Sequence, residues 1–202
     1  MATFLFDKIV FGPVRSRRLG VSLGVNLLPT TSKVCSFDCI YCECGWTHSA
    51  NSNKLPSRKE IRQKMEERLS QMKTDGEELN VITYAGNGEP TLHPEFAGII
   101  DDTIELRNKF FPKARIAVLS NSSMLHKPQV VKALLKVDQN ILKLDSGFDS
   151  TIQKLNQPHM PTTVEQVVKN LEKFNGNFTL QTLFVRGTHN GKAVDNTTEA
   201  EL

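Results

Sequence analysis

The sequence predicts an α/β fold in which parallel strands alternate with helices. Five apolar runs with strand composition recur along the 202 residues, and amphipathic helical patterns separate them. Each run passes directly into a polar or glycine-rich stretch. Strands that alternate with helices form parallel sheets with right-handed crossovers, so their carboxyl ends share one edge. We therefore expect a single domain over residues 1–202, with helices outside a parallel sheet.

Runs of β-branched and aromatic residues that end at turn signals place the strands. An apolar stretch over 4–11 is expected to be extended, and a basic loop over 12–20 follows it. Arg15, Arg17 and Arg18 in this loop match the geometry of an anionic substrate group, although a solvated loop is the simpler interpretation. The five expected strands occupy residues 21–28, 79–85, 114–119, 140–144 and 178–185.

Capping signals and apolar spacing place five helices after the strands. Ser57 and Thr163 each begin a capping box, while Pro94 and Pro128 open helices at their first turn. A short helix is expected over 149–155. The apolar stripe of the first helix is interpreted as facing the core, and it consists of Ile61, Met65, Leu69 and Met72.

The composition suits a globular protein of a reducing compartment. Hydrophobic residues make up 39% and charged residues 23%, and the net charge of +3 neither favours nor excludes nucleic acid. The amino terminus lacks a secretion signal, and no apolar stretch approaches the ~20 residues that span a bilayer. We expect a cytoplasmic protein without a membrane partner. An N-terminal extension over about 1–20 and a polar tail over about 188–202 are expected to flank the core.

All four cysteines of the chain lie within ten residues, at Cys35, Cys39, Cys42 and Cys44. Such crowding is unsuited to a disulfide framework and is typical of a metal or redox centre. The residues alone leave four interpretations open. They are a C-x-x-C redox pair, a four-cysteine zinc site, a 4Fe-4S cluster closed by four cysteines, and a cluster held by three cysteines with one iron open to another ligand.

The spacing Cys35-x3-Cys39-x2-Cys42, with Tyr41 before the last cysteine, resembles the motif of the radical S-adenosylmethionine (radical SAM) superfamily. The segment Asn87-Gly-Glu-Pro90 is similar to the Gly-Gly-Glu-Pro motif of the same family, with Asn87 where the first glycine is common. The stretches 12–29 and 86–94 further resemble uncharacterised radical SAM proteins related to the wyosine-type tRNA-modifying enzymes.

The resemblance implies a partial (β/α)6 TIM-like barrel of parallel strands. Because the sequence contains five such strands and ends soon after the fifth, we expect either a naturally short chain or one truncated before the sixth strand. The implied activity is that of a radical SAM iron–sulfur oxidoreductase. In such enzymes a 4Fe-4S cluster reductively cleaves S-adenosylmethionine (SAM) to a 5′-deoxyadenosyl radical, which abstracts hydrogen from a substrate.

The same resemblance assigns roles by position. Cys35, Cys39 and Cys42 are expected to hold the cluster, and Cys44 is expected to be a nearby free thiol. No catalytic residue beyond the cluster and cofactor site is implied. The residues expected to bind SAM are Tyr41, Asn87, Gly88, Glu89, Ser120, Asn121 and Asp145.

The partners remain open at the level of sequence. The substrate is expected to be an RNA base, a peptide or a small metabolite, and a one-electron donor such as flavodoxin or ferredoxin is implied. The alternative is a non-enzymatic protein that binds zinc or an iron–sulfur cluster with all four cysteines.

Overall fold

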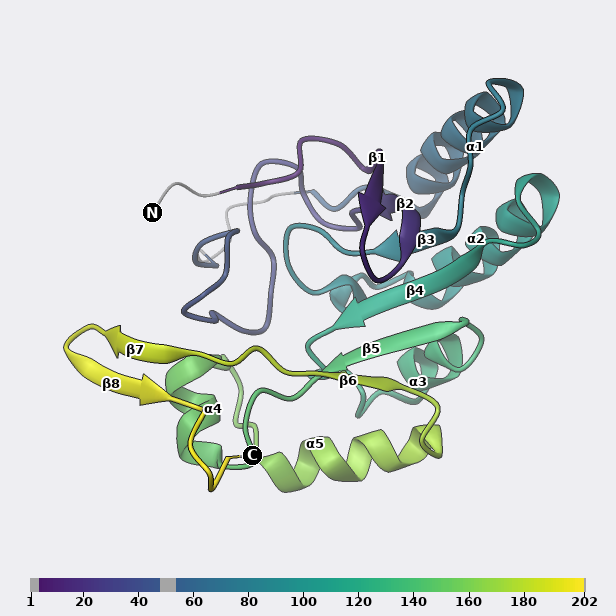
Figure 1. Cartoon of the computed structure of the whole chain (residues 1–202). Coiled ribbons are helices and arrows are strands. Elements are labelled where there is room, and N and C mark those ends of the chain that lie inside the picture. Colours follow the sequence, from purple (N-terminus) through teal and green to yellow (C-terminus); the bar gives the residue numbers. More distant parts are fainter. Residues whose placement is uncertain (1–3, 48–53, 202) are drawn as a thin grey trace.

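The computed structural model describes residues 4–47 and 54–201, so residues 1–3 of the expected extension and Leu202 of the expected tail lie outside the described residues. Its centre is a six-stranded sheet in the order β1-β2-β3-β4-β5-β6 (Figure 1). From β2 to β6 all neighbours are parallel, and β1 pairs antiparallel with β2. The strands are β1 (Val10–Ser16), β2 (Gly20–Val25), β3 (Val81–Tyr84), β4 (Arg115–Ser120), β5 (Gln139–Lys143) and β6 (Thr179–Gln181).

The α/β prediction with five parallel strands is confirmed. Within the described residues, β1 and β6 remain the two edges of the sheet, so the barrel is not closed. The loops that follow the parallel strands gather at the end of the sheet where the carboxyl ends of these strands lie, here called the carboxyl edge (Figure 1). This edge is where ligands bind in parallel α/β sheets.

All five expected helices are present. Ser57 and Thr163 accept hydrogen bonds from the backbone N–H groups of Glu60 and Gln166, as the two capping boxes predict. Short 3-10 turns cover Pro90–Leu92 and Glu172–Phe174. The helices are α1 (Arg58–Thr74), α2 (Phe96–Phe110), α3 (Pro128–Leu134), α4 (Asp149–Leu155) and α5 (Val164–Leu171).

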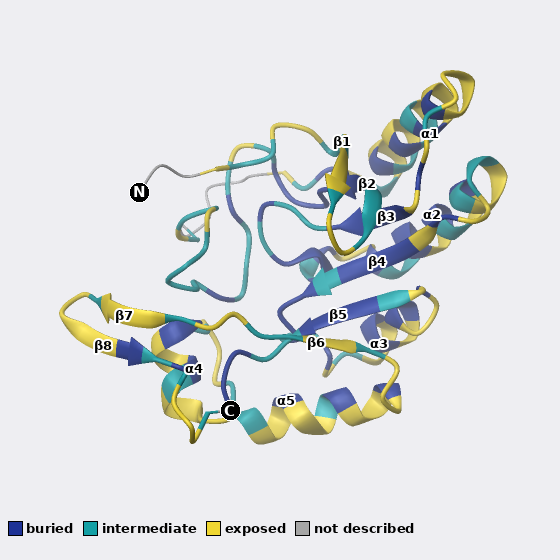
Figure 2. Ribbon diagram, viewed as in Figure 1, coloured by how far each residue is buried: buried dark blue, intermediate teal, exposed yellow. Residues whose placement is uncertain are grey.

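One apolar core lies between the sheet and the helices α1, α2, α3 and α5. Alternate strand residues face it because side chains of a strand point to opposite faces with a period of two. The apolar stripe of α1 is fully buried, and exposed residues lie on the outer sides of the helices (Figure 2). The strand residues that face the core are Leu23, Val25, Ile82, Tyr84, Ile116, Val118 and Leu142. The other face of the sheet carries the alternating residues, among them Ser22, Thr83, Ala117 and the apolar Val81 and Ile141.

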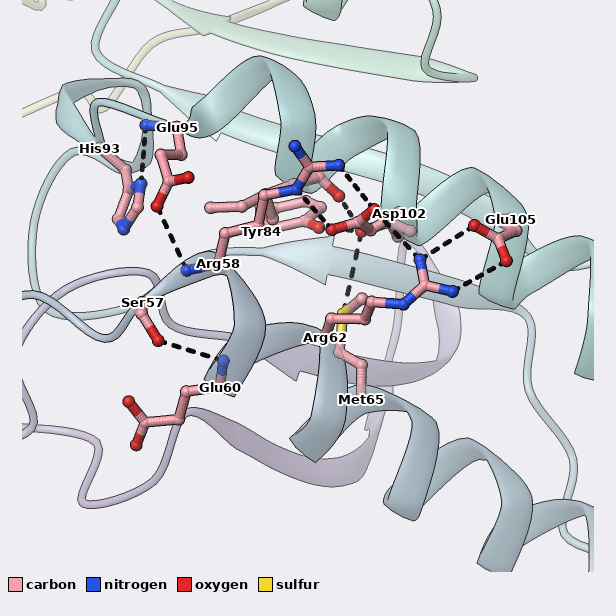
Figure 3. Close-up of polar contacts among 12 residues, drawn as sticks. Ser57, Arg58, Glu60, Arg62, Met65, Tyr84, His93, Glu95, Asp102 and Glu105 are labelled. Atoms are coloured by element: carbon pink, nitrogen blue, oxygen red, sulfur yellow. Dashed lines mark hydrogen bonds and ion pairs between the residues drawn. The ribbon is translucent and has the colours of Figure 1, made fainter.

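An ion-pair network joins α1 to α2 (Figure 3). Arg58 donates two hydrogen bonds to the carboxylate of Asp102, at 2.7 and 2.8 Å, and Arg62 donates a third at 3.1 Å. Arg62 also forms two hydrogen bonds with Glu105. These bonds hold the Arg58 pKa above and the Asp102 pKa below their usual values, chiefly through the hydrogen bond that the two share.

The expectation of a basic loop over 12–20 was wrong. Most of it belongs to β1, which runs from Val10 to Ser16 and forms a hairpin with β2. Arg15, Arg17 and Arg18 therefore lie at the turn before β2, at the opposite end of that strand from its carboxyl end. They do not belong to a site at the carboxyl edge.

The expected polar tail is also partly wrong, because β7 (Arg186–His189) and β8 (Lys192–Asp195) form an antiparallel hairpin. Val194 and Asn196 are buried within this segment. The fifth parallel strand is correspondingly shorter than expected, with three residues in place of 178–185. None of the helices in the described ranges is long and apolar enough to cross a membrane.

Candidate functional site

A cavity of about 210 Å³ lies at the carboxyl edge of the sheet, and all four cysteines line it. Its other walls come from the segment after β3, the carboxyl end of β4, and one residue each of β5 and β6. Gly88 and Glu89 follow β3, Ser120 and Asn121 end β4, and Gln181 belongs to β6. The cavity thus joins the cysteine loop to residues more than 130 positions away.

Two sets of backbone hydrogen bonds hold the cysteine loop. On one side Val34 donates to the carbonyl of Asn87 and accepts from Glu89, at 2.9 and 3.1 Å. On the other side Asp38 donates to the carbonyl of Gln157, two residues beyond α4, at 3.2 Å, and Ile40 donates to the carbonyl of Leu155, the last residue of α4, at 2.9 Å. The loop is therefore fixed between the β3 exit and α4 before any ligand is considered.

Gly88 makes the first of these contacts possible. It has a φ of 134°, and a Cβ atom there would lie 1.9 Å from the carbonyl oxygen of Val34. Only a glycine allows the two loops to approach this closely.

Amide groups donate to two cysteine sulfurs. Asn121 donates to Cys35 Sγ at 3.5 Å, and Asn156 donates to Cys39 Sγ at 3.3 Å. Hydrogen bonds of this kind stabilise ligating thiolates and tune iron–sulfur clusters. Cys44 differs, because its thiol donates to the Gly86 carbonyl at 3.7 Å.

The four thiols differ in pKa. Burial, followed by the charge of Glu89, raises the pKa of Cys35 to about 12, and burial also raises the pKa of Cys39. A hydrogen bond with Cys44 and the nearby Lys33 ammonium lower the pKa of Cys42 to about 6. The same hydrogen bond raises the pKa of Cys44, which therefore stays a protonated donor.

The four cysteines around one cavity supply the soft thiolate ligands that a 4Fe-4S cluster takes. Across residues 4–47 and 54–201, no three His, Cys, Asp or Glu side chains are arranged to hold one metal ion. A zinc site requires its ligands to converge on one point. In a 4Fe-4S cluster each thiolate binds a different iron, so three sulfurs around a cavity suffice.

Glu89 connects the walls of the cavity. Its side chain is 2% exposed and accepts hydrogen bonds from both the backbone and hydroxyl of Thr91, from Ser120 Oγ at 2.9 Å and from the Asn121 N–H at 2.6 Å. Burial raises the pKa of Glu89, although these hydrogen bonds oppose the effect. An ammonium group entering the cavity would meet an acceptor that is already oriented.

Tyr41 belongs to a polar cluster behind the cavity. Its hydroxyl donates to Asp145 and accepts from Lys143 at 2.9 Å and from Asn156 at 3.1 Å. The Lys143 ammonium also lies 5.0 Å from the centre of the Tyr41 ring. Burial raises the pKa of Tyr41, so its hydroxyl remains a donor.

Most predicted site residues come together at this edge. The three predicted ligands, Tyr41, Gly88, Glu89, Ser120 and Asn121 line the cavity. Asp145 lies behind it, next to Tyr41. The Asn87 side chain points elsewhere, exchanging two hydrogen bonds with the Phe6 backbone and donating a third to Pro29.

Sequence reasoning missed Lys33, Phe37, Asn156 and Gln181. Lys33, Phe37 and Gln181 line the cavity, and Asn156 bonds Cys39 and Tyr41. Phe37 occupies a variable position of the cysteine motif, and no motif includes the other three. Asn156 follows the end of α4, a position whose nearness to the cysteines depends on the tertiary fold.

A larger groove of about 840 Å³ lies between the N-terminal segment and α1. Ile9, Leu28 and Leu55 are among its apolar lining residues, and ionic side chains of α1 form part of its wall. None of the predicted site residues belongs to its described lining, so it is a separate feature.

Sequence comparison identifies a family match and several relatives. The family model of the Radical SAM superfamily matches residues 30–198. The chain is 33% identical over 172 residues to the UPF0026 protein MJ1312 of Methanocaldococcus jannaschii, covering 84% of this chain and 50% of that protein. It is 31% identical to the UPF0026 protein slr1464 of Synechocystis, covering 84% and 60% respectively. The chain thus spans only half to three-fifths of these relatives.

Solved structures show the same fold at low sequence identity. A structure of native anSMEcpe with bound AdoMet superposes with a TM-score of 0.55 at 18% identity, covering 80% of this chain and 42% of that chain. A crystal structure of archaeal TYW1 has a TM-score of 0.50 at 14% identity, covering 82% and 56%.

Proposed function

The chain belongs to the Radical SAM superfamily, and from that premise we propose that it uses a 4Fe-4S cluster and SAM to oxidise a substrate by hydrogen abstraction. In this proposal Cys35, Cys39 and Cys42 hold the cluster. The observation that carries it is the single cavity lined by these cysteines and by Glu89. When bound, the cluster supplies the electron that cleaves SAM reductively to the 5′-deoxyadenosyl radical.

The chain's own residues bind and orient the cofactor. Glu89, held by Ser120 and Asn121, accepts hydrogen bonds from the amino group of SAM. Gly88 keeps the backbone of this loop against the cysteine loop. Tyr41 and the buried carboxylate of Asp145 form the polar wall on the β5 side. Together these residues fix the cofactor and keep water from the reactive carbon.

For the substrate we propose only a chemical class. An RNA base, a peptide or a small metabolite would each reach the cavity through its open side, and a one-electron donor such as flavodoxin or ferredoxin would reduce the cluster. Because the chain spans about half of its relatives, a substrate assay should use full-length relatives beside this chain.

The test is anaerobic iron–sulfur reconstitution followed by incubation with dithionite and SAM. We expect 5′-deoxyadenosine, measured by chromatography and mass spectrometry, and its loss in Cys39→Ala. Cys44→Ala is the matched control, expected to keep both the cluster and SAM cleavage because Cys44 bonds the Gly86 carbonyl. Fully loaded wild-type protein that forms no 5′-deoxyadenosine would refute the proposal.

The second candidate function is a non-enzymatic metal-binding protein. The observation in its favour is that Cys44 lines the same cavity as the other three cysteines. Metal analysis separates the two candidates. A colourless protein with one zinc per chain, lost in Cys44→Ala, would support this second function.

A further inference from the structure

Lys33 is a buried lysine directly beside the cysteines. The residue is 4% exposed, its side chain only 1%, and it lines the same cavity as Cys35 and Cys42. Lysine is rarely buried without a partner, since moving an ammonium out of water is strongly unfavourable unless the group is paired and hydrogen-bonded. A position with this cost calls for a role in the site.

The ammonium of Lys33 is held in one orientation. It donates to Asp38 Oδ1 and to the Gly45 carbonyl, each at 2.9 Å. Asp38 is in turn fixed by the N–H of Thr47 at 2.8 Å and by His159 Nε2 at 2.9 Å. The Lys33–Asp38 ion pair therefore connects the cavity to His159, whose side chain is partly exposed.

The ion pair lies beside the cysteines. Lys33 lines the cavity with Cys35 and Cys42, and its ammonium is paired with the Asp38 carboxylate at 2.9 Å. The hydrogen bonds from Lys33 and from the Thr47 N–H hold Asp38 as the acceptor of this pair.

We propose that Lys33 is a positioning residue whose fixed positive charge stabilises the reduced state of a cluster held by Cys35, Cys39 and Cys42, and that Asp38 limits this effect. The inference rests on the proposed function. Reduction adds one negative charge to the cluster, so a cation nearby favours it and an anion opposes it. The effect is strong because the pair is screened little by solvent.

A purely structural ion pair would look different. Lys136 and Asp101 form one on the surface, at 2.6 Å with both side chains about half exposed. Lys33 instead lines the cavity together with Cys35 and Cys42, and its ammonium donates to a backbone carbonyl and to a carboxylate. Lys136→Met is therefore the matched control for loss of a lysine charge that is remote from the cysteines.

The test is the midpoint potential of the reconstituted cluster, followed by electron paramagnetic resonance in an anaerobic redox titration. At the potential where the wild type is half reduced, Lys33→Met should lower the reduced-to-oxidised ratio at least tenfold, which corresponds to about 59 mV for one electron. Asp38→Asn should raise the ratio, since it removes the opposing anion. Lys33→Arg and Lys136→Met should stay within a factor of two of the wild type.

Shifts of the midpoint potential in opposite directions in Lys33→Met and Asp38→Asn support the proposal. A loss of packing would not shift the potential in opposite directions in the two variants. Wild-type potentials in both variants at full iron content overturn it, as do shifts in the same direction. If Lys33→Met takes up no cluster, Asp38→Asn and Lys33→Arg decide: a raised ratio in Asp38→Asn with a wild-type ratio in Lys33→Arg supports the proposal, and an unchanged or lowered ratio in Asp38→Asn overturns it. A cluster that forms normally but never cleaves SAM would instead count against the proposed function alone. A wild-type chain without a cluster overturns both.

Discussion

At the scale of single residues, Glu89 organises the site outside the cysteine loop. It lies after β3, yet its carboxylate is bonded by Ser120 and Asn121 at the end of β4. The relative placement of two strand ends therefore depends on one side chain. The same carboxylate lines the cavity with the cysteines, and burial of the Cys35 thiol, followed by the negative charge of Glu89, raises the pKa of Cys35.

Glu89→Gln should weaken SAM binding to the reconstituted protein at least tenfold. The amide has one acceptor atom where the carboxylate has two, so one buried donor loses its partner, at a cost of about 1–3 kcal/mol. Isothermal titration with SAM and chemical denaturation would measure the two effects. Glu165→Gln, on the exposed side of α5, is the control, and equal affinities in both variants would contradict the role of Glu89.

Gly88→Ala should separate the cysteine loop from the β3 exit. A Cβ atom at this backbone conformation meets the Val34 carbonyl, and relief requires movement of backbone on one side or the other. We expect about 2–4 kcal/mol of lost stability and a fall in iron bound per chain. Gly187→Ala, where a Cβ would meet nothing within 4 Å, should change neither quantity.

The candidate site was predictable where residues sit in local motifs. Cysteine spacing and the segment from Asn87 to Pro90 indicate residues that do meet at the cavity. Lys33 and Asn156 could not be predicted, because their roles depend on contacts that no local pattern encodes. Asn87 is the opposite case, a motif residue whose side chain lies outside the cavity. Its backbone carbonyl bonds the cysteine loop at Val34, but its side chain bonds the Phe6 backbone.

At the scale of elements, the strongest local signals predicted most of the fold. Capping boxes and the proline start at Pro128 predicted where α1, α3 and α5 begin, and strand runs placed the five parallel strands. The helix expected to open at Pro94 begins at Phe96, and α4 was expected without a capping signal. β1 was missed because Gly12, Pro13 and basic residues read as a loop, although pairing with β2 makes this segment a strand. In α5 only Val167 and Leu171 are buried, and the neighbouring Val168 is 42% exposed because it lies on the outer side of the helix.

Asp102→Asn should loosen the contact between α1 and α2 and change the pH dependence of stability. Hydrogen bonds from Arg58 and then Arg62 lower the pKa of Asp102. A lowered pKa stabilises the fold above the ordinary value of about 3.8, and this stability is lost as the pH falls through the lower, folded-state pKa. We expect a cost of about 1–2 kcal/mol at neutral pH.

Urea denaturation at pH 7 and near pH 3 would check the Asp102 prediction. The difference between the variant and the wild type should shrink at the lower pH. Glu66→Gln is the control, because Glu66 joins the same two helices through an exposed pair with Lys109 and should have no measurable effect. A constant difference at both pH values would exclude the ionised carboxylate as the cause.

At the scale of the whole molecule, the open sheet places every element of the site along one edge. The C-terminal hairpin returns to this edge, and Asn196 fastens it there. The Asn196 side chain, 1% exposed, donates to the carbonyls of Asp145 and Leu183 and accepts from the Val185 N–H. The hairpin is therefore part of the wall behind Tyr41 and not an independent tail.

Asn196→Ala should release the hairpin while leaving the helical core intact. Three buried hydrogen bonds are lost, so amide exchange in β7 and β8 should become on the order of 10–100-fold faster. Hydrogen–deuterium exchange by mass spectrometry would locate the change. Asn177→Ala, an exposed asparagine before β6, is the control, and unchanged protection of the hairpin in Asn196→Ala would contradict this anchoring.

The N-terminal segment bears on how the site is assembled as the chain is made. Phe4 donates to the Glu43 carbonyl, Phe6 is bonded to Asn87, and the Phe6 ring stacks on Phe11 at 3.9 Å. These residues thus bond partners about 40 and 80 positions later in the chain. The cysteine loop can be joined to the β3 exit only once β3 and that exit have been synthesised. Between the synthesis of the cysteine loop and that of the exit, the cysteines lie on a loop that lacks its hydrogen bonds to the exit, and an oxidant would reach them more readily than in the folded protein.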